Sequence, residues 1–262
     1  MKVTFLGSGT SHGVPMIGCA CPTCLSADPR DKRTNASLLV QRGDKNILVD
    51  CGRDFRQQAL RHGLDRVDYL LLTHTHFDHV AGIDDLRVFN RRGEPIPLLG
   101  SQAHLAYLKK YIYHYLFDPG IQRGGGVTFL DLVAVGERFQ LEGLAFETLP
   151  ALHGGIDVLG YKFGGCAYLS DVSSVPASTL QKLYGLDLLI LGALRHTPHP
   201  THFTLSQALQ VAAEVKPRRV YFTHLCHDVA HAEIEQAFRE PGSPYFTSLD
   251  AHLAYDGLAL EV

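Results

Sequence analysis

Thr73-His74-Thr75-His76-Phe77-Asp78-His79 follows the apolar run Tyr69-Leu70-Leu71-Leu72 and places three imidazoles and a carboxylate within six positions. The apolar run predicts a buried strand, and the residues directly after such a strand lie where α/β proteins open their clefts. Imidazole and carboxylate together suit zinc, manganese or iron. Four donors packed this closely serve two metals better than one. We therefore interpret the segment as a metal site rather than as a solvated, histidine-rich turn.

Length and composition favour a globular enzyme. The chain has 262 residues, of which 45% are hydrophobic, and we expect residues 1–262 to form a single domain. The formal net charge of −3 and the absence of a long Lys/Arg run argue against nucleic acid as a partner. No apolar stretch approaches the length of a membrane span, and residues 1–7 resemble a first strand more than a signal peptide. We expect a cytoplasmic protein with reduced cysteines.

Three of the six cysteines form a cluster in one loop. Cys19, Cys21 and Cys24 have the spacing C-x-C-x-x-C, and glycine and proline mark the loop that carries them. Three thiolates this close together predict a structural zinc site that needs a fourth ligand, for which His227 and Cys226 are both candidates. A zinc held in this way would connect the two ends of the chain. The alternative is a cluster of free thiols in a mobile loop.

Three further polar residues follow apolar runs, at the positions where additional ligands of a two-metal site are expected. They are His153, Asp171 and His224. Each of them alone would more often be an ordinary loop or capping residue. Together they supply donors that the first cluster lacks, and Asp171 can bridge two cations through its two oxygens.

Short strands and helices alternate along the chain, without an internal repeat or a low-complexity linker. The predicted strands lie at 3–6, 37–41, 46–50, 67–72, 98–100, 144–149, 158–163, 167–169, 186–191, 219–222 and 252–256. The predicted helices lie at 55–62, 79–89, 101–115, 177–184, 205–214 and 229–239. So many strands exceed one ordinary parallel sheet, so we expect two sheets packed face to face with helices outside.

The motif His74-x-His76-x-Asp78-His79, followed by His153, Asp171 and His224, resembles the metallo-β-lactamase superfamily over nearly the whole chain. The resemblance implies an α/β fold, the αββα four-layer sandwich of the metallo-β-lactamase type. The loop at 7–15, the cysteine cluster and the segment Gly82-Ile83-Asp84-Asp85-Leu86-Arg87 resemble the PhnP-type phosphodiesterases, which act on phosphoribosyl 1,2-cyclic phosphate.

The resemblance also implies a set of metal ligands. One divalent metal (Mn²⁺ or Zn²⁺) would be held by His74, His76 and His153, the other by Asp78, His79 and His224, and Asp171 would be shared. A structural Zn²⁺ would be held by Cys19, Cys21, Cys24 and His227. Asp78 and His202, which lies in Thr201-His202-Phe203-Thr204, are the residues assigned to catalysis, His202 near the leaving group. His196 and His199 are alternatives for that role, and His12 could either line the site or bond the backbone of its own loop.

The implied activity is hydrolysis of a small cyclic phosphodiester by a metal-activated hydroxide. The alternatives are a nuclease that processes the 3′ end of tRNA and an accessory protein like PqqB. No membrane partner is expected, nucleic acid is disfavoured, and a homodimer remains open. The segment 111–126, with Arg123 as a candidate for a second substrate phosphate, could be a flap over the pocket or a helix end followed by a surface loop.

Overall fold

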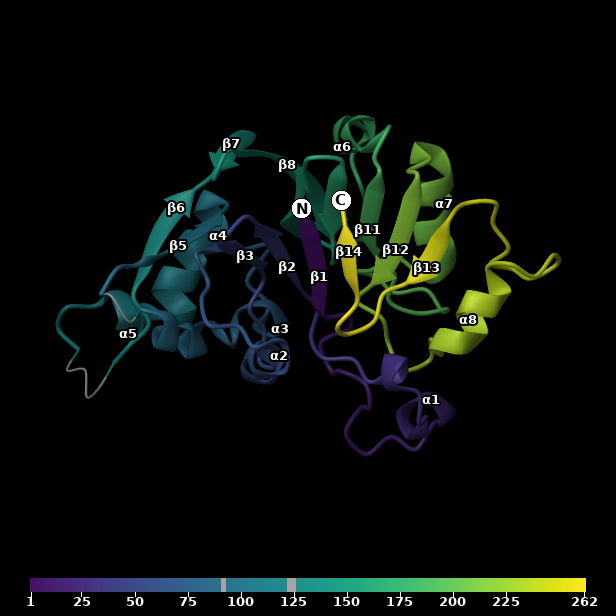
Figure 1. Ribbon diagram of the computed structural model, residues 1–262, viewed down its shortest axis with the longest axis horizontal. Coiled ribbons are helices and arrows are strands. Elements are labelled where there is room, and N and C mark those ends of the chain that lie inside the picture. The colour runs from purple at the N-terminus through teal and green to yellow at the C-terminus, as the bar shows by residue number, and fades with distance from the viewer. Residues whose placement is uncertain (91–92, 122–125) are drawn as a thin grey trace.

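The computed structural model describes residues 1–90, 93–121 and 126–262, and within them two seven-stranded mixed sheets pack against each other (Figure 1). The first sheet has the order β14-β1-β2-β3-β4-β5-β6 and the second the order β13-β12-β11-β10-β9-β8-β7. The strands of the first sheet are β1 (Lys2–Gly7), β2 (Ser37–Arg42), β3 (Lys45–Val49), β4 (Tyr69–Leu71), β5 (Ile96–Gly100), β6 (Leu130–Ala134) and β14 (Ala259–Glu261). Those of the second are β7 (Arg138–Leu141), β8 (Leu144–His153), β9 (Ile156–Phe163), β10 (Cys166–Leu169), β11 (Leu188–Gly192), β12 (Arg219–Thr223) and β13 (Ala251–Leu253).

Helices cover the outer face of each sheet. Those on the first sheet are α2 (Phe55–His62), α3 (Phe77–Val80), α4 (Gln102–Tyr107) and α5 (His114–Phe117), and those on the second are α6 (Ala177–Leu183), α7 (Leu205–Val215) and α8 (His231–Ala237). The short helix α1 (Pro22–Leu25) lies away from both sheets, in the loop that carries the cysteine cluster (Figure 1). Phe5 and Phe146 are buried between the sheets, Phe55 packs on the outside of the first sheet, and Leu205 packs on the outside of the second. These three apolar layers separate four layers of secondary structure, so the predicted αββα sandwich is confirmed.

Parallel strands bring their carboxyl ends to one edge of the sandwich. Strands β3 to β6 are parallel to one another, and so are β10 to β13. Strand β8 is antiparallel to β9, which is antiparallel to β10, so β8 ends at the same edge as β10. The polar residues that follow these strands in the sequence therefore meet in space.

Two helix predictions were wrong in their extent. The single helix predicted at 79–89 is divided into α3 and a 3₁₀ helix at Ile83–Phe89. The break is at Gly82, whose N–H donates to the carbonyl of Cys51 and on which a Cβ would lie 2.2 Å from the carbonyl oxygen of Gly52. The helix predicted at 101–115 is divided into α4, a π-helical turn at Leu108–Ile112, and α5.

Three strands and one helix were not predicted. Strands β6, β7 and β14 lie at or beside the open sides of the sheets, and α1 lies within the loop of the cysteine cluster. In the described part of the chain, none of the helices combines the length and the apolar character that crossing a membrane would require.

A close backbone contact beside the site gives a test of this arrangement. A Cβ added to Gly192 would lie 1.5 Å from the carbonyl oxygen of Ser170, the residue before Asp171. Overpacking of a core typically costs about 1–3 kcal/mol. We expect Gly192→Ala to lower the free energy of unfolding by at least that amount in a denaturant titration. Gly136→Ala, where a Cβ meets open space, is the matched control and should change little; equal effects of the two substitutions would contradict the prediction.

Candidate metal centre

The loop after β4 places the first group of candidate ligands. His74 is buried, His76 is the N-cap of α3, and His153 ends β8 on the opposite sheet. The centroids of the three rings lie 4.6, 5.0 and 5.4 Å apart, and one nitrogen of each ring lies within 4.8 Å of the others. The structure thus brings together the three residues predicted for the first metal.

Asp78, His79, Asp171 and His224 form the second group. The Nε2 atom of His79 lies 3.4 Å from Asp78 Oδ2 and 3.2 Å from Asp171 Oδ1. The Nε2 atom of His224 lies 3.5 and 3.2 Å from the Oδ2 atoms of Asp78 and Asp171. Ligands placed tetrahedrally at about 2.0–2.1 Å from zinc are separated by roughly 3.4 Å. The four side chains therefore have the spacing of a metal's ligands.

Several buried atoms of these side chains lack a hydrogen-bond partner among the described residues. They are His74 Nε2, His79 Nε2, His224 Nε2 and Asp171 Oδ1. Leaving a buried polar atom unsatisfied costs about 1–3 kcal/mol, so this many at one place indicates a ligand that contacts all of them. Divalent cations fit, because imidazole nitrogens and carboxylate oxygens are their usual donors.

The pKa values of Asp171 and His79 also indicate a site for divalent cations. Burial raises the pKa of Asp171, but the imidazoles of His224 and His79 outweigh burial and hold that pKa well below its usual range. Burial also lowers the pKa of His79, yet Asp171, Asp50 and Asp78 raise it well above the ordinary value. Asp171 is thus ionised, as a metal ligand must be, and three carboxylates concentrate negative charge around one ring.

Asp50 is a functional residue that our sequence interpretation missed. It is fully buried, with φ at 60°, and its Oδ2 lies 2.8 Å from His79 Nδ1 and accepts from Thr73 Oγ1. The Oδ1 atom accepts from the N–H of Thr73. Asp50 therefore orients both the loop and the ring whose Nε2 faces the cluster. The available signal was its position directly after Ile47-Leu48-Val49, the same signal that identified Asp171.

His202 lies between the two groups. Its ring centroid is 4.5 Å from that of His153 and 4.9 Å from that of His224, and its Nδ1 is 3.9 Å from Asp171 Oδ2. Thr204, in the same segment, caps α7 by exchanging hydrogen bonds with Gln207, and this fixes the backbone two residues after His202. Burial and the neighbouring His224 lower the pKa of His202 to about 3, so its imidazole is neutral at pH 7.

The other histidines considered for this role have different surroundings. His196 contacts the hydroxyl of Tyr245 and the carbonyl of Asp228, and His199 contacts the Oγ1 of Thr201. His12 is exposed on a turn of the first loop.

The tyrosines of the 111–126 segment favour the helix-end interpretation, because Tyr113 donates to the carbonyl of Val80 and Tyr115 donates to Asp84. Arg123, which we considered for a second phosphate, lies outside the described residues.

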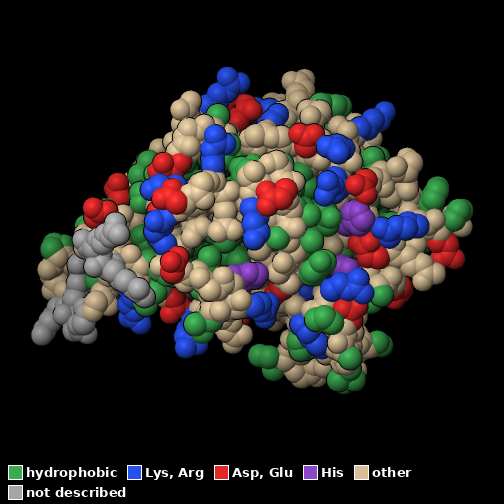
Figure 2. Space-filling view, viewed as in Figure 1, with side chains coloured by type: hydrophobic (Ala, Val, Ile, Leu, Met, Phe, Trp, Pro, Cys, Tyr) green, Lys and Arg blue, Asp and Glu red, His purple; other side chains and the backbone are tan. Residues whose placement is uncertain are grey.

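The cysteine cluster lies on a protrusion below the sheets, formed by the loop that contains α1 (Figures 1 and 2). The Sγ atoms of Cys19 and Cys21 are each 3.3 Å from His227 Nδ1, and all four predicted zinc ligands have donor atoms within 4.8 Å of one another. His227, not Cys226, completes the group. The backbone N–H of Cys24 and then His227 lower the pKa of Cys21 to about 6, which favours a thiolate.

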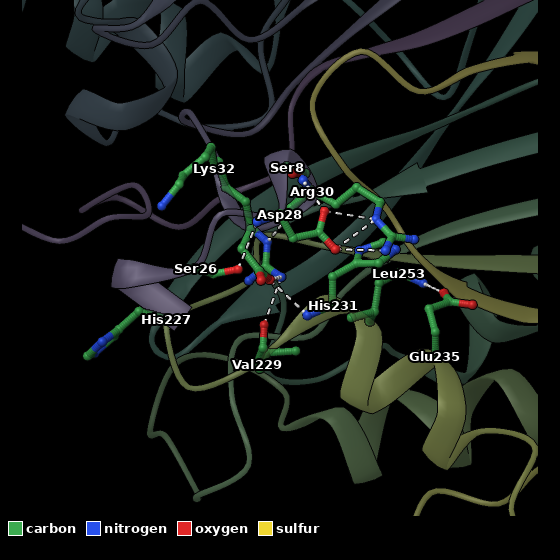
Figure 3. A network of polar contacts seen from close by, with 12 residues as sticks. Ser8, Ser26, Asp28, Arg30, Lys32, His227, Val229, His231, Glu235 and Leu253 are labelled. Atoms are coloured by element: carbon green, nitrogen blue, oxygen red, sulfur yellow. Dashed lines mark hydrogen bonds and ion pairs between the residues drawn. The ribbon is translucent and has the colours of Figure 1, made fainter. Parts of the chain in front are cut away.

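A polar network attaches this loop to the second sheet (Figure 3). Arg33 has a fully buried side chain and donates to the carbonyls of Cys226 and Val229, on either side of His227. Asp31 accepts from both Arg33 and the backbone N–H of His231. These contacts join the strand end that carries His224 to the loop that carries the cysteines.

Two facing sheets in a four-layer sandwich, with paired histidine and aspartate clusters at one edge, define a metal-dependent hydrolase. The beta-lactamase superfamily domain model matches residues 45–225. The crystal structure of a new diphosphatase from the PhnP family is 39% identical, covers 100% of this chain and 97% of that chain, and superposes with a TM-score of 0.87. The chain belongs to the metallo-β-lactamase superfamily and, within it, to the PhnP family.

Two further relatives match this chain over a smaller share of their length or at lower identity. An octanoyltransferase from Porphyromonas gingivalis is 39% identical over 260 residues, which are 98% of this chain but 51% of that protein. The chain thus spans about half the length of this relative. Zinc-bound PqqB from Methylobacterium extorquens is 21% identical with a TM-score of 0.79 over 100% of both chains, which shows a shared fold.

The cysteine cluster predicts a zinc content that can be measured. If Cys19, Cys21, Cys24 and His227 hold a structural zinc, Cys21→Ser should lose about one zinc per chain and lower the melting temperature, because a structural zinc contributes folding free energy. Elemental analysis and thermal unfolding are the measurements. Cys226→Ser is the matched control and should keep its zinc. An unchanged zinc content in Cys21→Ser would rule out the assignment.

The position of Asp50 predicts that its substitution lowers metal affinity, although Asp50 is not itself a ligand. In Asp50→Asn the amide cannot accept all three hydrogen bonds, so the orientation of His79 is lost. We expect metal affinity at the histidine and aspartate clusters to fall about 10–100-fold, measured by competition with a chelating dye. Asp44→Asn, a substitution at a carboxylate that is 80% exposed, is the control. Equal affinities for the two variants would show that Asp50 does not position His79.

Proposed function

We propose that the chain hydrolyses small phosphodiesters, with a cyclic ribose phosphate as the best substrate, at a centre of two divalent metals. Manganese or zinc would be held by His74, His76 and His153, and by Asp78, His79 and His224, with Asp171 shared. The observation that carries the proposal is the position of His202, whose ring lies 4.5 Å from that of His153 and 4.9 Å from that of His224. His202 also has a donor atom within 4.8 Å of those of His153 and Asp171, and we assign it to the substrate because the other seven side chains already form two complete groups. Membership of the PhnP family supports a phosphoester as substrate.

The side chains have separate parts in this reaction. When bound, two divalent cations supply the charge that lowers the pKa of a water molecule and neutralises phosphoryl oxygens. Asp171 and Asp78 are ionised and hold that charge at the edge of the sheets, and Asp50 keeps the Nε2 of His79 directed at it. His202, neutral at pH 7, donates an N–H to the phosphoryl or leaving oxygen. The leaving oxygen of a cyclic phosphate stays attached, so the product is a phosphomonoester.

A substrate screen tests the proposal directly. Metal-loaded protein is assayed against cyclic nucleoside phosphates, linear diesters, a dinucleoside diphosphate and an octanoyl thioester. The thioester is included because of the octanoyltransferase relative. We expect turnover of cyclic phosphodiesters and none of the thioester. Hydrolysis of the thioester alone, or of the linear diesters alone, would contradict the proposal of a cyclic phosphodiesterase.

Substitution of His202 separates its role from metal binding. We expect His202→Ala to keep both metals of the centre and lose about 10²–10³-fold in kcat, the usual contribution of a transition-state hydrogen bond. Asp171→Ala should lose metal and activity together. Metal content by elemental analysis and steady-state kinetics are measured on the same samples. A His202→Ala protein with wild-type activity, or with a missing metal, would contradict the assignment.

A further inference from the structure

We infer that Asp256 is a positioning residue for the metal centre: through the first loop, residues 7–15, it holds the turn that directs His224 towards Asp78 and Asp171. Neither group of candidate ligands includes Asp256. The inference rests on the centre of two metals in the proposed function and is independent of the substrate.

The carboxylate of Asp256 is buried and holds two separate segments of the chain. Only 2% of its side chain is exposed. Its Oδ1 accepts from the N–H and from the hydroxyl of Ser8, both over 2.9 Å. Its Oδ2 accepts from the N–H and the hydroxyl of Thr34 over 2.8 and 2.6 Å, and from Arg61 Nη1 over 3.2 Å. Each oxygen therefore fixes a different segment.

Asp256 lies where the chain crosses from the second sheet to the first. It belongs to the connection between β13 and β14, which turns at the lower end of β1 in Figure 1. The N–H of Gly257 donates to the carbonyl of Phe5, and the N–H of Phe5 donates to the carbonyl of Leu258. Strand β1 is antiparallel to β2, which is antiparallel to β3, so β1 ends at the same edge as β3. The carboxylate thus lies at the edge where the parallel strands end.

The first loop passes this constraint on to the residue after His224. The N–H of Leu225 donates to the carbonyl of Ser8 over 2.9 Å, and the N–H of Thr10 donates to the carbonyl of Leu225 over 3.1 Å. His224 itself has φ at 59°, a left-handed conformation that persists only where the surroundings hold it. Without the contacts to Asp256 the first loop can shift, and the imidazole of His224 then turns away from the two aspartates.

Substitution of Asp256 by asparagine tests the inference through metal binding. In Asp256→Asn one side of the group becomes an N–H donor, so the group can accept from Ser8 or from Thr34 but not from both. Cobalt(II) is titrated into metal-free protein, and its absorption separates thiolate ligands at the cysteine cluster from nitrogen and oxygen ligands at the histidine and aspartate clusters. We expect the cobalt ion held by His224 to bind about tenfold more weakly, at the lower end of the range for residues that orient a ligand. The other ion of the centre should keep its affinity.

A second variant separates positioning from general loss of stability. Leu183 is fully buried on the outside of the second sheet, in the core cluster that α6 and α7 cover. Leu183→Ala should lower the melting temperature through the cavity it leaves, while cobalt binding stays as in the wild type. Unchanged cobalt affinity in Asp256→Asn, or the same loss of affinity in Leu183→Ala, would overturn the inference.

Amide hydrogen exchange provides a measurement that needs no metal. In metal-free Asp256→Asn the N–H of Leu225 should exchange about tenfold faster than in the wild type, the factor that one hydrogen bond contributes, whereas the N–H of Phe222 within β12 should keep its rate. If the wild-type clusters bind no metal, the proposed function fails, and the exchange rate of Leu225 still decides whether Asp256 holds the turn. An unchanged rate at Leu225 would show that it does not.

Discussion

The buried negative charge at the edge of the two sheets is the constraint on which the rest of the structure depends. Asp50 and Asp171 are almost fully buried and Asp78 is 8% exposed, and all three lie within 3.4 Å of the imidazole of His79. Burying carboxylates in a low-dielectric interior is costly unless they are paired. One imidazole cannot neutralise three carboxylates. Cations at this edge would therefore stabilise the fold by the same contacts that make the site reactive.

Strand β12 links the two candidate metal sites. His224 follows its last residue in a left-handed conformation, with φ at 59°, and three residues later His227 contacts the cysteine cluster. Left-handed backbone is unfavourable for histidine and persists only where its surroundings hold it. Leu225 bonds to the first loop and Arg33 holds the carbonyl of Cys226, so the turn is fixed from both sides. The cysteine loop thus supports the conformation that directs His224 into the cluster.

The pattern of apolar runs and polar residues predicted two facing sheets and a shared metal site, for a physical reason, whereas the division of the ligands into two groups came from the resemblance to a known family. Parallel strands end at one edge, so a polar residue after each apolar run is placed near the others whatever the loops between them do. The break in the helix predicted at 79–89 was harder to predict. It occurs at Gly82, whose N–H donates to the carbonyl of Cys51, and Cys51 is distant from Gly82 in the sequence. Strands β6, β7 and β14 were missed for a similar reason. Their strand conformation depends on pairing with a neighbouring strand more than on their own sequence pattern.

Asp50 shows a further limit of sequence reasoning. It lies in the short loop after β3, where the sequence offers no histidine to attract attention. Its role depends on His79, which lies 29 residues later in the chain. The folded chain brings this pair together, so a motif search finds the ligands and overlooks the residue that orients one of them.

Exposed apolar side chains lie beside the histidine and aspartate clusters, and they bear on substrate selectivity. Phe77, between His76 and Asp78 in the sequence, is 71% exposed. Ile156, paired with His153 across the β8–β9 hairpin, is 40% exposed on the side of the first ligand group. A ligand that spans both groups would meet these exposed apolar side chains beside the clusters. In the proposed reaction the clusters act on the phosphoryl group alone, so discrimination among substrates falls to side chains such as Phe77 and Ile156.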